Sequence, residues 1–386
     1  MIVIDCFSLI LKEGGTKAYL RSLLHAISLR HKTPITLLVP DLPEVNDADI
    51  PTTPSFTIHK KQLNPFLLSL IKAITGSAYY RYIAYIWEAY YLPKEIHILN
   101  PDIIFHPYQI VTDYQTHAKK LVVVHDIFHW KYQDRYSYIE KKIYNTFLKG
   151  CETADSIITI SDTSKNEIIH NTQIPKEKVI VCYEGFNAEY LHINSPEEVK
   201  AVLHKYNLPS LYVLSFNSPR THKNTIASVN VFAKLKKRAP DLRLILIGGT
   251  IHTNPQVYMY LKDNNLLDSV DCIPLVETIH HFKVIYQYSL VFIFLSTEEG
   301  FGLPPLEALA SGTLPIISQL SSMKELFVPF IPSFNPDNTD EIADYINTVI
   351  AHPEIKTAAI HKAEVLLQKY SWQAILPLYA NILSLE

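Results

Sequence analysis

Short apolar runs rich in β-branched residues recur along the chain, and longer segments with helical spacing separate them. Runs that are apolar on both faces are typical of parallel strands covered by helices on each side. Their alternation with helical segments predicts doubly wound α/β sheets. The predicted strands are Ile2–Cys6, Ile35–Val39, Ile103–His106, Leu121–Val124, Ser156–Ile160, Val179–Tyr183, Leu211–Phe216, Leu242–Ile247, Val270–Leu275, Val291–Leu295 and Leu314–Ile317. Eleven strands are many for one such sheet, so the pattern predicts two Rossmann-like domains.

The domain boundary is expected in the stretch Phe186–Ser210, where the first set of strands ends and a polar segment and a helix follow. We place an N-terminal domain at residues 1–190 and a C-terminal domain at residues 191–369, in keeping with a length of 386 residues. Residues 370–386 predict an amphipathic helix interrupted near Pro377. That helix either crosses back to the first domain, which is the division adopted here, or caps the second.

Composition excludes several classes of protein. Hydrophobic residues make up 48% of the chain, and a net charge of −3 gives no electrostatic reason to expect nucleic acid. The cysteines are scattered without zinc-like spacing, which predicts buried thiols in a reducing cytosol; they are Cys6, Cys151, Cys182 and Cys272. The N-terminus reads as a strand, and no apolar stretch approaches the roughly 20 residues that span a bilayer. We therefore expect a cytoplasmic protein.

The strongest chemical signal is Ser296-Thr-Glu-Glu-Gly-Phe-Gly-Leu-Pro-Pro-Leu-Glu-Ala-Leu-Ala-Ser-Gly-Thr, which follows a predicted strand. Its glycines allow a tight turn, and its paired prolines suit a helix start. This pattern puts Glu299 in the loop and Glu307 in the first turn of the helix. The free N–H groups of that turn favour a diphosphate, and a carboxylate beside it accepts hydrogen bonds from sugar hydroxyls.

This segment resembles the E-x7-E motif of retaining glycosyltransferases with the GT-B fold, particularly glycosyltransferase family 4. The resemblance implies two Rossmann-like domains facing a central cleft. It also implies that Glu299 contacts the transferred sugar and that Glu307 holds the nucleotide ribose. The backbone amides of Phe301, Gly302 and Leu303 are expected to cover the sugar and the diphosphate.

A second segment, Ser215-Phe-Asn-Ser-Pro-Arg-Thr-His-Lys-Asn, follows the strand Leu211–Leu214 and could neutralise two phosphates. It is similar to the phosphate-binding segment of the same family, in which Lys223 corresponds to the phosphate-binding lysine. Arg220 is the one nearby arginine that could assist it. The chain departs from the family at Asn217, where a glycine is usual.

Two segments of the first domain complete the resemblance. The strand Val122–Val124 ends in His125-Asp126, a pair that the family places against the reacting sugar, with the histidine backbone carbonyl near the anomeric centre and the aspartate orienting the turn. Gly14 and Gly15 form a glycine turn after the first strand, and in related transferases this turn approaches the donor phosphates. Ser161 predicts a helix N-cap.

The resemblance implies transfer of a sugar from a nucleoside diphosphate sugar with retention of configuration, without a metal or a bound cofactor. GDP-mannose is the first choice of donor, and a saccharide or lipid-linked precursor of a cell-surface polysaccharide is the expected acceptor. Asp47-Ala48-Asp49 has no preceding apolar strand and reads as solvated surface rather than a metal motif. A sugar-nucleotide epimerase, a phosphorylase and a non-catalytic nucleotide-sugar-binding subunit remain alternatives.

The stretch from residue 60 to residue 92 interleaves apolar and aromatic side chains with Lys61, Lys72 and Arg81. Such a mixture fits a peripheral contact with the inner face of a membrane. The other interpretation is a pair of buried helices in the first domain.

Overall fold

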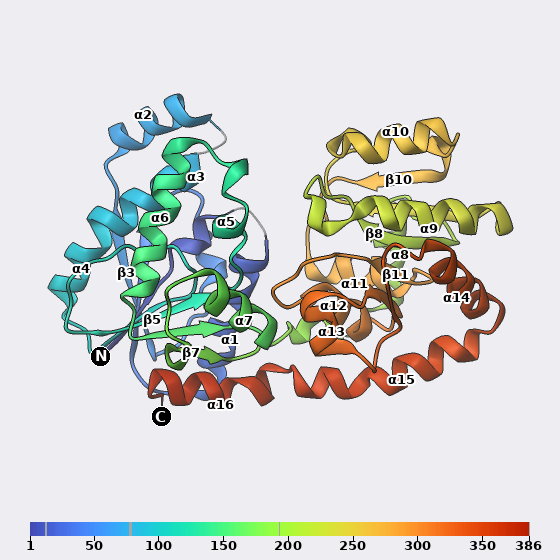
Figure 1. The fold of residues 1–386 in the computed structure, drawn as a ribbon. Helices are drawn as coiled ribbons and strands as arrows, with labels where there is room; N and C mark the ends of the chain where they lie inside the picture. The colour runs from blue at the N-terminus through green and yellow to red at the C-terminus, as the bar shows by residue number, and fades with distance from the viewer. Residues whose placement is uncertain (12–13, 77–78, 193, 386) are drawn as a thin grey trace. The chain divides into compact units, whose positions relative to one another are not determined.

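The structure is a computed structural model that describes residues 1–11, 14–76, 79–192 and 194–385. It divides into two compact units, Met1–Gly185 with Trp372–Glu386, and Phe186–Ser371. Each unit contains its own parallel β-sheet with helices packed against it (Figure 1).

The first unit holds a parallel sheet in the order β3-β2-β1-β4-β5-β6-β7. Its strands are β1 (Ile2–Asp5), β2 (Ile35–Asp41), β3 (Phe56–Gln62), β4 (Ile103–His106), β5 (Lys119–Val124), β6 (Ser156–Thr159) and β7 (Val179–Val181). Its helices are α1 (Gly15–Arg30), α2 (Pro65–Thr75), α3 (Tyr79–Ile86), α4 (Leu92–Leu99), α5 (Phe128–Lys131), α6 (Tyr138–Glu152), α7 (Asp162–Asn171) and α16 (Trp372–Leu383). Short turns are η1 (Phe7–Ile10), η2 (Asp47–Asp49), η5 (Gln133–Arg135) and η6 (Lys176–Lys178), and a π-helical segment, η4 (Trp87–Tyr91), joins α3 to α4.

The second unit holds a parallel sheet in the order β10-β9-β8-β11-β12-β13. Its strands are β8 (Tyr212–Phe216), β9 (Arg243–Ile247), β10 (Val270–Ile273), β11 (Phe292–Phe294), β12 (Pro315–Ser318) and β13 (Ser333–Phe334). Its helices are α8 (Pro196–Lys205), α9 (Thr225–Arg238), α10 (Pro255–Asp263), α11 (Ile279–Gln287), α12 (Leu303–Ala310), α13 (Ser321–Phe327), α14 (Thr339–Ala351) and α15 (Pro353–Lys369). Short turns are η7 (Ala188–Leu191), η8 (Thr221–Lys223), η9 (Ile251–Thr253) and η10 (Leu267–Ser269), and α9 lies against β8 (Figure 1).

The predicted doubly wound α/β class is confirmed, and each of the predicted strands coincides with an observed strand within two residues at either end. Two strands were not predicted. Strand β3 is an edge strand whose residues are mostly exposed, so it lacks the apolar run of a central strand. Strand β13 contains two residues, too few for any periodic pattern.

Helix α16 belongs to the first unit, where it packs against α1 (Figure 1). The predicted interruption near Pro377 is wrong, because the helix continues through this proline to Leu383. Proline in a helix interior removes one backbone hydrogen bond. Here the apolar face offsets that loss, since Ile375, Leu376 and Tyr379 are buried.

The part of the chain that the structure describes contains no helix with both the length and the apolar character needed to cross a membrane. The free cysteines are buried, apart from the half-buried Cys272. Ser161 caps α7 as predicted, with its hydroxyl oxygen accepting a hydrogen bond from the Ser164 N–H at 3.0 Å.

Gly150 lies inside α6, where glycine is normally unfavourable. The reason is a close approach of backbone, since a Cβ atom at this position would lie 2.1 Å from the carbonyl oxygen of Val111. The missing side chain therefore allows α6 to pack directly on the segment that follows β4.

We expect Gly150→Ala to lower the free energy of unfolding by about 1–3 kcal/mol, because forced overpacking outweighs the gain in helix propensity. Gly15→Ala is the matched control, since a Cβ at Gly15 meets nothing within 4 Å. Urea denaturation followed by circular dichroism measures both variants. Equal stability of the two variants would contradict the packing argument.

Candidate active site

Lys223 and Glu299 lie together in the second unit, although they are 76 positions apart in the sequence. The Lys223 ammonium donates to both carboxylate oxygens of Glu299, at 2.7 and 2.9 Å. Lys223 ends the turn η8 after β8, and Glu299 stands in the loop after β11, the neighbouring strand. Parallel strands end at the same edge of the sheet, so the two loops meet there. The predicted phosphate-binding lysine and the predicted sugar-binding glutamate are thus neighbours.

Backbone contacts fix these two loops against each other. The carbonyl oxygen of His222 accepts hydrogen bonds from the Thr297 N–H and the Ser296 hydroxyl, both at 2.8 Å. The hydroxyls of Ser321 and Ser322 donate to the Glu299 carbonyl oxygen, at 3.1 and 2.8 Å. These contacts hold the Glu299 backbone in place, and its side chain faces Lys223.

Helix α12 begins one residue before the start that the paired prolines indicated. Gly302 is the N-cap, with a left-handed φ of 103°, and the helix starts at Leu303. The prediction that Glu307 lies in the first turn is therefore wrong, because Glu307 is the fifth residue of the helix. Pro304 and Pro305 have no N–H, so this helix start offers fewer amide donors than an ordinary one.

Phe301 and Leu303, two of the residues whose amides are expected to cover a donor, have side chains in different environments. The Phe301 ring is buried and packs edge-on against Tyr370 and Phe327, with centroids 5.2 and 6.4 Å away. Leu303 is half-buried at the first position of α12. The Phe301 side chain thus anchors the loop in the core, and only its backbone can serve a ligand.

Glu307 is enclosed by two tyrosines of the second unit. The Tyr286 hydroxyl donates to the Glu307 carboxylate at 3.5 Å, and Tyr190 lies beside Tyr286 with ring centroids 6.3 Å apart. Burial raises the pKa of Glu307 to about 7, while the hydroxyls of Tyr190 and Tyr286 partly offset this rise. A carboxyl with a pKa near neutrality changes its charge readily when a ligand donates hydrogen bonds to it.

Arg220 and Asn217 belong to the same loop as Lys223, between β8 and α9. Arg220 is exposed at the N-cap of η8, and among the described residues its side chain forms no ion pair with Glu299. Asn217 is buried, and its amide nitrogen donates to the Thr250 carbonyl oxygen at 2.8 Å. Within the described part of the chain, the amide oxygen of Asn217 has no hydrogen-bond partner. Asn217, which stands where the family usually has a glycine, therefore links the loop after β8 to the loop after β9.

His125 lies in the first unit, buried at the end of β5. Its Nδ1 lies 2.9 Å from a carboxylate oxygen of Glu184, and its Nε2 lies 3.0 Å from the carbonyl oxygen of Pro107. Although burial acts to lower the pKa of His125, the Glu184 carboxylate and the Pro107 carbonyl raise it above its usual value. Since both neighbours accept hydrogen bonds, the arrangement favours the imidazolium form with two N–H donors.

Asp126 orients the turn that follows His125, as expected from the sequence. Its carboxylate accepts a hydrogen bond from the Phe128 N–H at 3.1 Å. Gln109 holds the same turn, because its amide accepts from the His125 N–H at 3.3 Å and donates to the Asp126 carbonyl oxygen at 3.1 Å. The His125 carbonyl oxygen, expected near the anomeric centre, accepts a hydrogen bond from the Ser164 hydroxyl at 3.2 Å.

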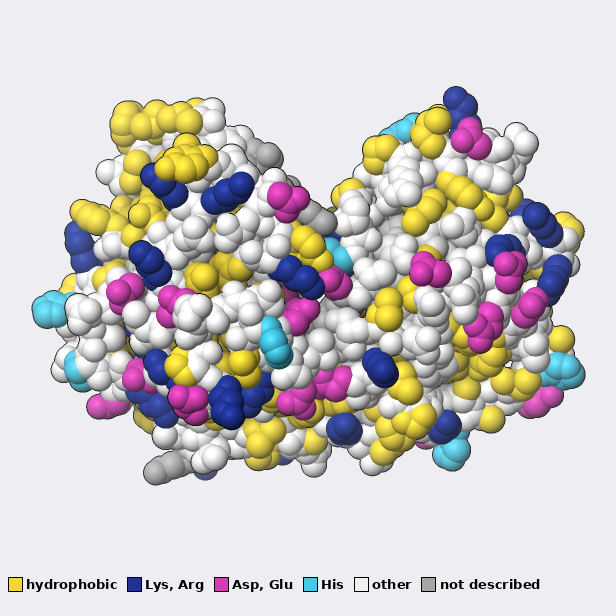
Figure 2. Space-filling model, in the orientation of Figure 1, with side chains coloured by type: hydrophobic (Ala, Val, Ile, Leu, Met, Phe, Trp, Pro, Cys, Tyr) yellow, Lys and Arg dark blue, Asp and Glu magenta, His cyan; other side chains and the backbone are white. Residues whose placement is uncertain are grey.

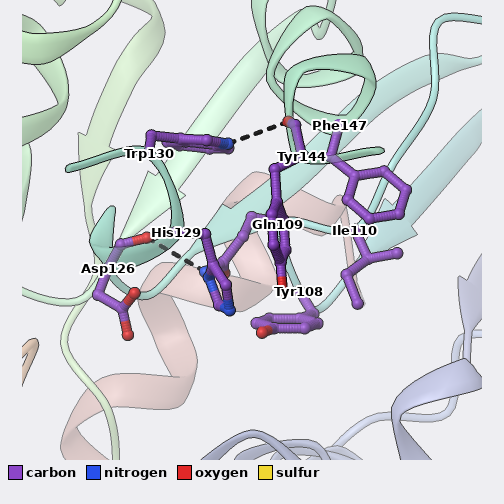
Figure 3. Close-up of a pocket in the computed structure, with 8 residues that line it drawn as sticks. All are labelled: Tyr108, Gln109, Ile110, Asp126, His129, Trp130, Tyr144 and Phe147. Atoms are coloured by element: carbon purple, nitrogen blue, oxygen red, sulfur yellow. Dashed lines mark hydrogen bonds between the residues drawn. The ribbon is translucent and has the colours of Figure 1, made fainter. Parts of the chain in front are cut away.

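A pocket of the first unit opens beside this turn. Figure 3 shows Trp130 above Asp126 and His129, with Tyr144 at the centre and Tyr108 below it. The Trp130 indole N–H donates to the Tyr144 carbonyl oxygen at 3.1 Å, which fixes that ring. The complete lining is Tyr108, Gln109, Ile110, Asp126, His129, Trp130, Tyr144 and Phe147. Aromatic rings with a few polar groups are typical of carbohydrate-binding surfaces.

Gly14 and Gly15 are exposed at the N-terminus of α1, in the first unit. Gly14 has extended backbone angles, which any residue can adopt, so neither glycine is required by the local conformation.

The expectation that Asp49 is solvated is wrong. Asp49 is buried and forms ion pairs with Lys17 and Arg21, at 3.0 and 3.2 Å.

Sequence reasoning missed several residues of these sites. Glu184 directly follows the predicted strand Val179–Tyr183, so the rule that chemistry follows strand ends could have found it. Tyr190, Tyr286 and Gln109 carry no local signal. They reach Glu307 and His125 only through the tertiary fold.

Two family profiles match this chain. "Glycosyltransferase Family 4" matches residues 14–190, and "Glycosyl transferases group 1" matches residues 201–365. The chain is 24% identical over 263 residues to the serotype-specific mannosyltransferase WbdA of Escherichia coli, covering 66% of this chain and 32% of WbdA. It is 25% identical over 266 residues to the O-antigen chain mannosyltransferase RfbU of Salmonella typhimurium, covering 68% and 69%. The chain thus spans about one third of the length of the WbdA proteins it matches.

Among solved structures, the chain is similar to Anabaena Alr3699/HepE in complex with UDP and glucose, with a TM-score of 0.71 and 18% identity over 99% of each chain. This likeness confirms the predicted GT-B class of fold. The two profiles meet near the boundary between the two units and together account for most of the sequence. The chain belongs to the family 4 glycosyltransferases, the glycosyl transferases group 1.

Proposed function

We propose that this protein transfers a hexose, with mannose as the first candidate, from a nucleoside diphosphate sugar to a saccharide or lipid-linked acceptor in the synthesis of a cell-surface polysaccharide. The observation that carries the proposal is the pairing of Lys223 with Glu299 at 2.7 Å, beside the start of α12. The names of the relatives WbdA and RfbU support a mannosyl donor and an O-antigen-type acceptor. GDP-mannose is therefore the first donor to test.

We assign each group of the second unit one task in the reaction. The bond from the anomeric carbon to the diphosphate breaks, and its electron pair goes to the phosphate oxygen. Lys223, with Arg220 and the amides of Phe301, Gly302 and Leu303, stabilises the negative charge that develops there. Because this positive charge comes from the protein, we propose that transfer needs neither a metal nor a bound cofactor.

We propose that the acceptor hydroxyl attacks the face from which the diphosphate departs and gives its proton to a phosphate oxygen, so that the configuration is retained. Glu299 then serves as a hydrogen-bond acceptor for the sugar hydroxyls rather than as a nucleophile. With a donor bound, the Lys223 ammonium exchanges its contact with Glu299 for the phosphates, and the sugar hydroxyls replace it at the carboxylate.

We propose that the first unit binds the acceptor. His125 and Asp126 are assigned to the reacting sugar, Gly14 and Gly15 to the donor phosphates, and the surface around Tyr108 and Asp126 to an acceptor sugar. Tyr108 is half-buried and offers a ring on which a pyranose can stack, and the Asp126 carboxylate can accept from the sugar hydroxyls.

We propose that α2 contacts a membrane that carries the acceptor, at the inner face of the cell membrane. Phe66, Leu70 and Ile74 form an exposed apolar stripe on this helix, and Phe66 and Ile74 are 78% and 74% exposed. Figure 2 shows this apolar surface over α2 at the upper left. Lys72 is exposed on the same helix, whereas Lys61 and Arg81 pair with Glu95 and Glu140.

The rest of the stretch from residue 60 to residue 92 has other environments. Lys60 and Lys61 belong to strand β3, and Ile83 and Trp87 are core residues, while residues 77 and 78 lie outside the described residues. The interpretation as buried helices thus holds for α3, and the proposed membrane contact rests on α2 alone.

The proposed reaction predicts release of a nucleoside diphosphate only when a donor and a suitable acceptor are both present. Thermal-shift screening across GDP-, UDP-, ADP- and dTDP-sugars identifies the donor, and coupled detection of the released nucleotide measures transfer. We expect Glu299→Gln to lower kcat by about 100-fold, because a positioned carboxylate is lost from the reacting sugar. Full transfer by this variant would contradict the assigned role, and donor binding without transfer would indicate a non-catalytic subunit.

Lys223→Ala is expected to weaken nucleoside diphosphate binding by about 10- to 100-fold, because a charge-assisted hydrogen bond to phosphate is lost. Isothermal titration calorimetry measures the affinity. Lys237→Ala is the matched control, since Lys237 is exposed on α9 in the same unit. Unchanged affinity in the Lys223→Ala variant would contradict the assignment of this lysine to the donor site.

The affinity for the nucleoside diphosphate should depend on pH through Glu307. Ribose hydroxyls stabilise the ionised carboxylate, which forms above the pKa of about 7 and is lost as the pH falls below it. We expect the affinity to fall by up to about fivefold between about pH 7 and about pH 6. Glu307→Gln should bind more weakly at about pH 8 and lose this slope, which separates the effect from titration of the nucleotide. Parallel pH profiles for both proteins would contradict the ribose contact.

Phe66→Asp and Ile74→Asp should each reduce binding to anionic vesicles by at least about threefold, because each removes a large apolar contact with lipid. Ile98→Asp in α4, at an equally exposed position, is the matched control. Co-sedimentation with vesicles measures the bound fraction. Failure of the unsubstituted protein to sediment with vesicles would contradict the proposed membrane contact.

A further inference from the structure

Three ligating side chains converge inside the first unit, outside the residues assigned to transfer. Asp5 ends β1, His106 ends β4, and Glu88 lies in the π-helical segment η4. Strands β1 and β4 are parallel neighbours with Ile4 opposite Phe105, so Asp5 and His106 follow at adjacent positions. One ligand atom from each side chain lies within 4.8 Å of the other two. Single-turn π-helical segments are frequent at functional sites.

These groups are fully buried, yet several of their polar atoms have no hydrogen-bond partner within the described part of the chain. The Glu88 side chain is 0% exposed, and among the described residues neither of its carboxylate oxygens is hydrogen-bonded. Nδ1 of His106 is likewise without a partner there. A buried carboxylate left unsatisfied is strongly destabilising, so such a group requires a partner of some kind.

The separations leave room for an ion between the three atoms. His106 Nδ1 lies 3.9 Å from Asp5 Oδ2 and 3.8 Å from Glu88 Oε1, too far for direct hydrogen bonds. Ligands bound to a zinc ion at roughly 2.0–2.2 Å in a tetrahedral site are separated by roughly 3.3–3.6 Å, so the two separations observed here would shorten slightly around an ion. The alternative occupant is a proton shared between the Asp5 and Glu88 carboxyls, and replacement of Glu88 tests this alternative.

The surrounding groups hold the three ligands in place. The Trp87 indole N–H and the Phe7 N–H donate to Asp5 Oδ1, at 2.9 and 3.1 Å, which leaves Oδ2 for the cluster. His106 Nε2 lies 3.0 Å from the Tyr114 hydroxyl. A partner on the second ring nitrogen is the usual way in which a protein orients a metal-binding histidine.

We propose that Asp5, Glu88 and His106 bind one divalent transition-metal ion, with zinc as the first candidate and manganese as the second. One imidazole nitrogen and two carboxylate oxygens suit these ions, and their two negative charges balance the charge of the ion. The ion ties η4 to the carboxyl ends of β1 and β4. Its role is structural, because all three ligands are buried inside the first unit.

The metal content of the purified protein tests this proposal. Untagged protein expressed in zinc- or manganese-supplemented medium and passed over a chelating resin should retain about one equivalent of metal per chain by mass spectrometry. Glu88→Gln should retain at least about tenfold less metal and melt at a lower temperature, because a charged ligand is lost. Asp49→Asn, which removes another buried carboxylate of the same unit, should keep its metal.

The Glu88→Gln variant also distinguishes a bound metal ion from a shared proton. If Glu88 were held by a proton, the amide introduced by Glu88→Gln would copy the protonated acid, and the melting temperature of the variant would not change. Less than about 0.1 equivalent of metal in the unsubstituted protein from both media would overturn the proposal. His106→Asn provides a second ligand variant if Glu88→Gln does not fold, and an unchanged metal content in it would have the same consequence.

Discussion

The chemistry of this protein depends on one constraint, which is that parallel strands deliver their following loops to the same edge of a sheet. Lys223 follows β8 and Glu299 follows β11, and these strands are neighbours in the second sheet. Hydrogen bonds from Thr297 and Ser296 to the His222 carbonyl oxygen then lock one loop to the other. A cationic group and a carboxylate are thereby held in direct hydrogen-bonding contact.

The two glutamates of the motif have different environments, and this difference suits different tasks. Glu299 is paired with an ammonium group, whereas Glu307 faces the hydroxyls of two tyrosines. Since burial raises the pKa of Glu307 to about 7, the charge of this residue is sensitive to the hydrogen bonds that a ligand brings. A sugar and a ribose present many hydroxyl donors of this kind.

The first unit stabilises its polar residues in two ways. His125 is satisfied at both ring nitrogens by Glu184 and Pro107, and Gln109 holds the turn at its backbone. The cluster around Glu88 is not satisfied by the protein atoms that the structure describes, which is why a bound cation is the natural proposal there. His125 and the cluster around Glu88 both lie at or near strand ends of the first sheet. The same sheet therefore positions the proposed sugar-binding histidine and the proposed structural metal site.

The sequence by itself determined the α/β class, the strands with apolar runs and the motif residues Lys223, Glu299 and Glu307, because each depends on local periodicity or on a short contiguous pattern. It did not determine the start of α12, since the left-handed conformation of Gly302 moves that start to Leu303. Contacts between distant segments were equally hidden, such as Asp49 with Lys17, Glu184 with His125 and Tyr286 with Glu307. Only the tertiary structure decided them, because burial and pairing arise from the meeting of loops far apart in the chain.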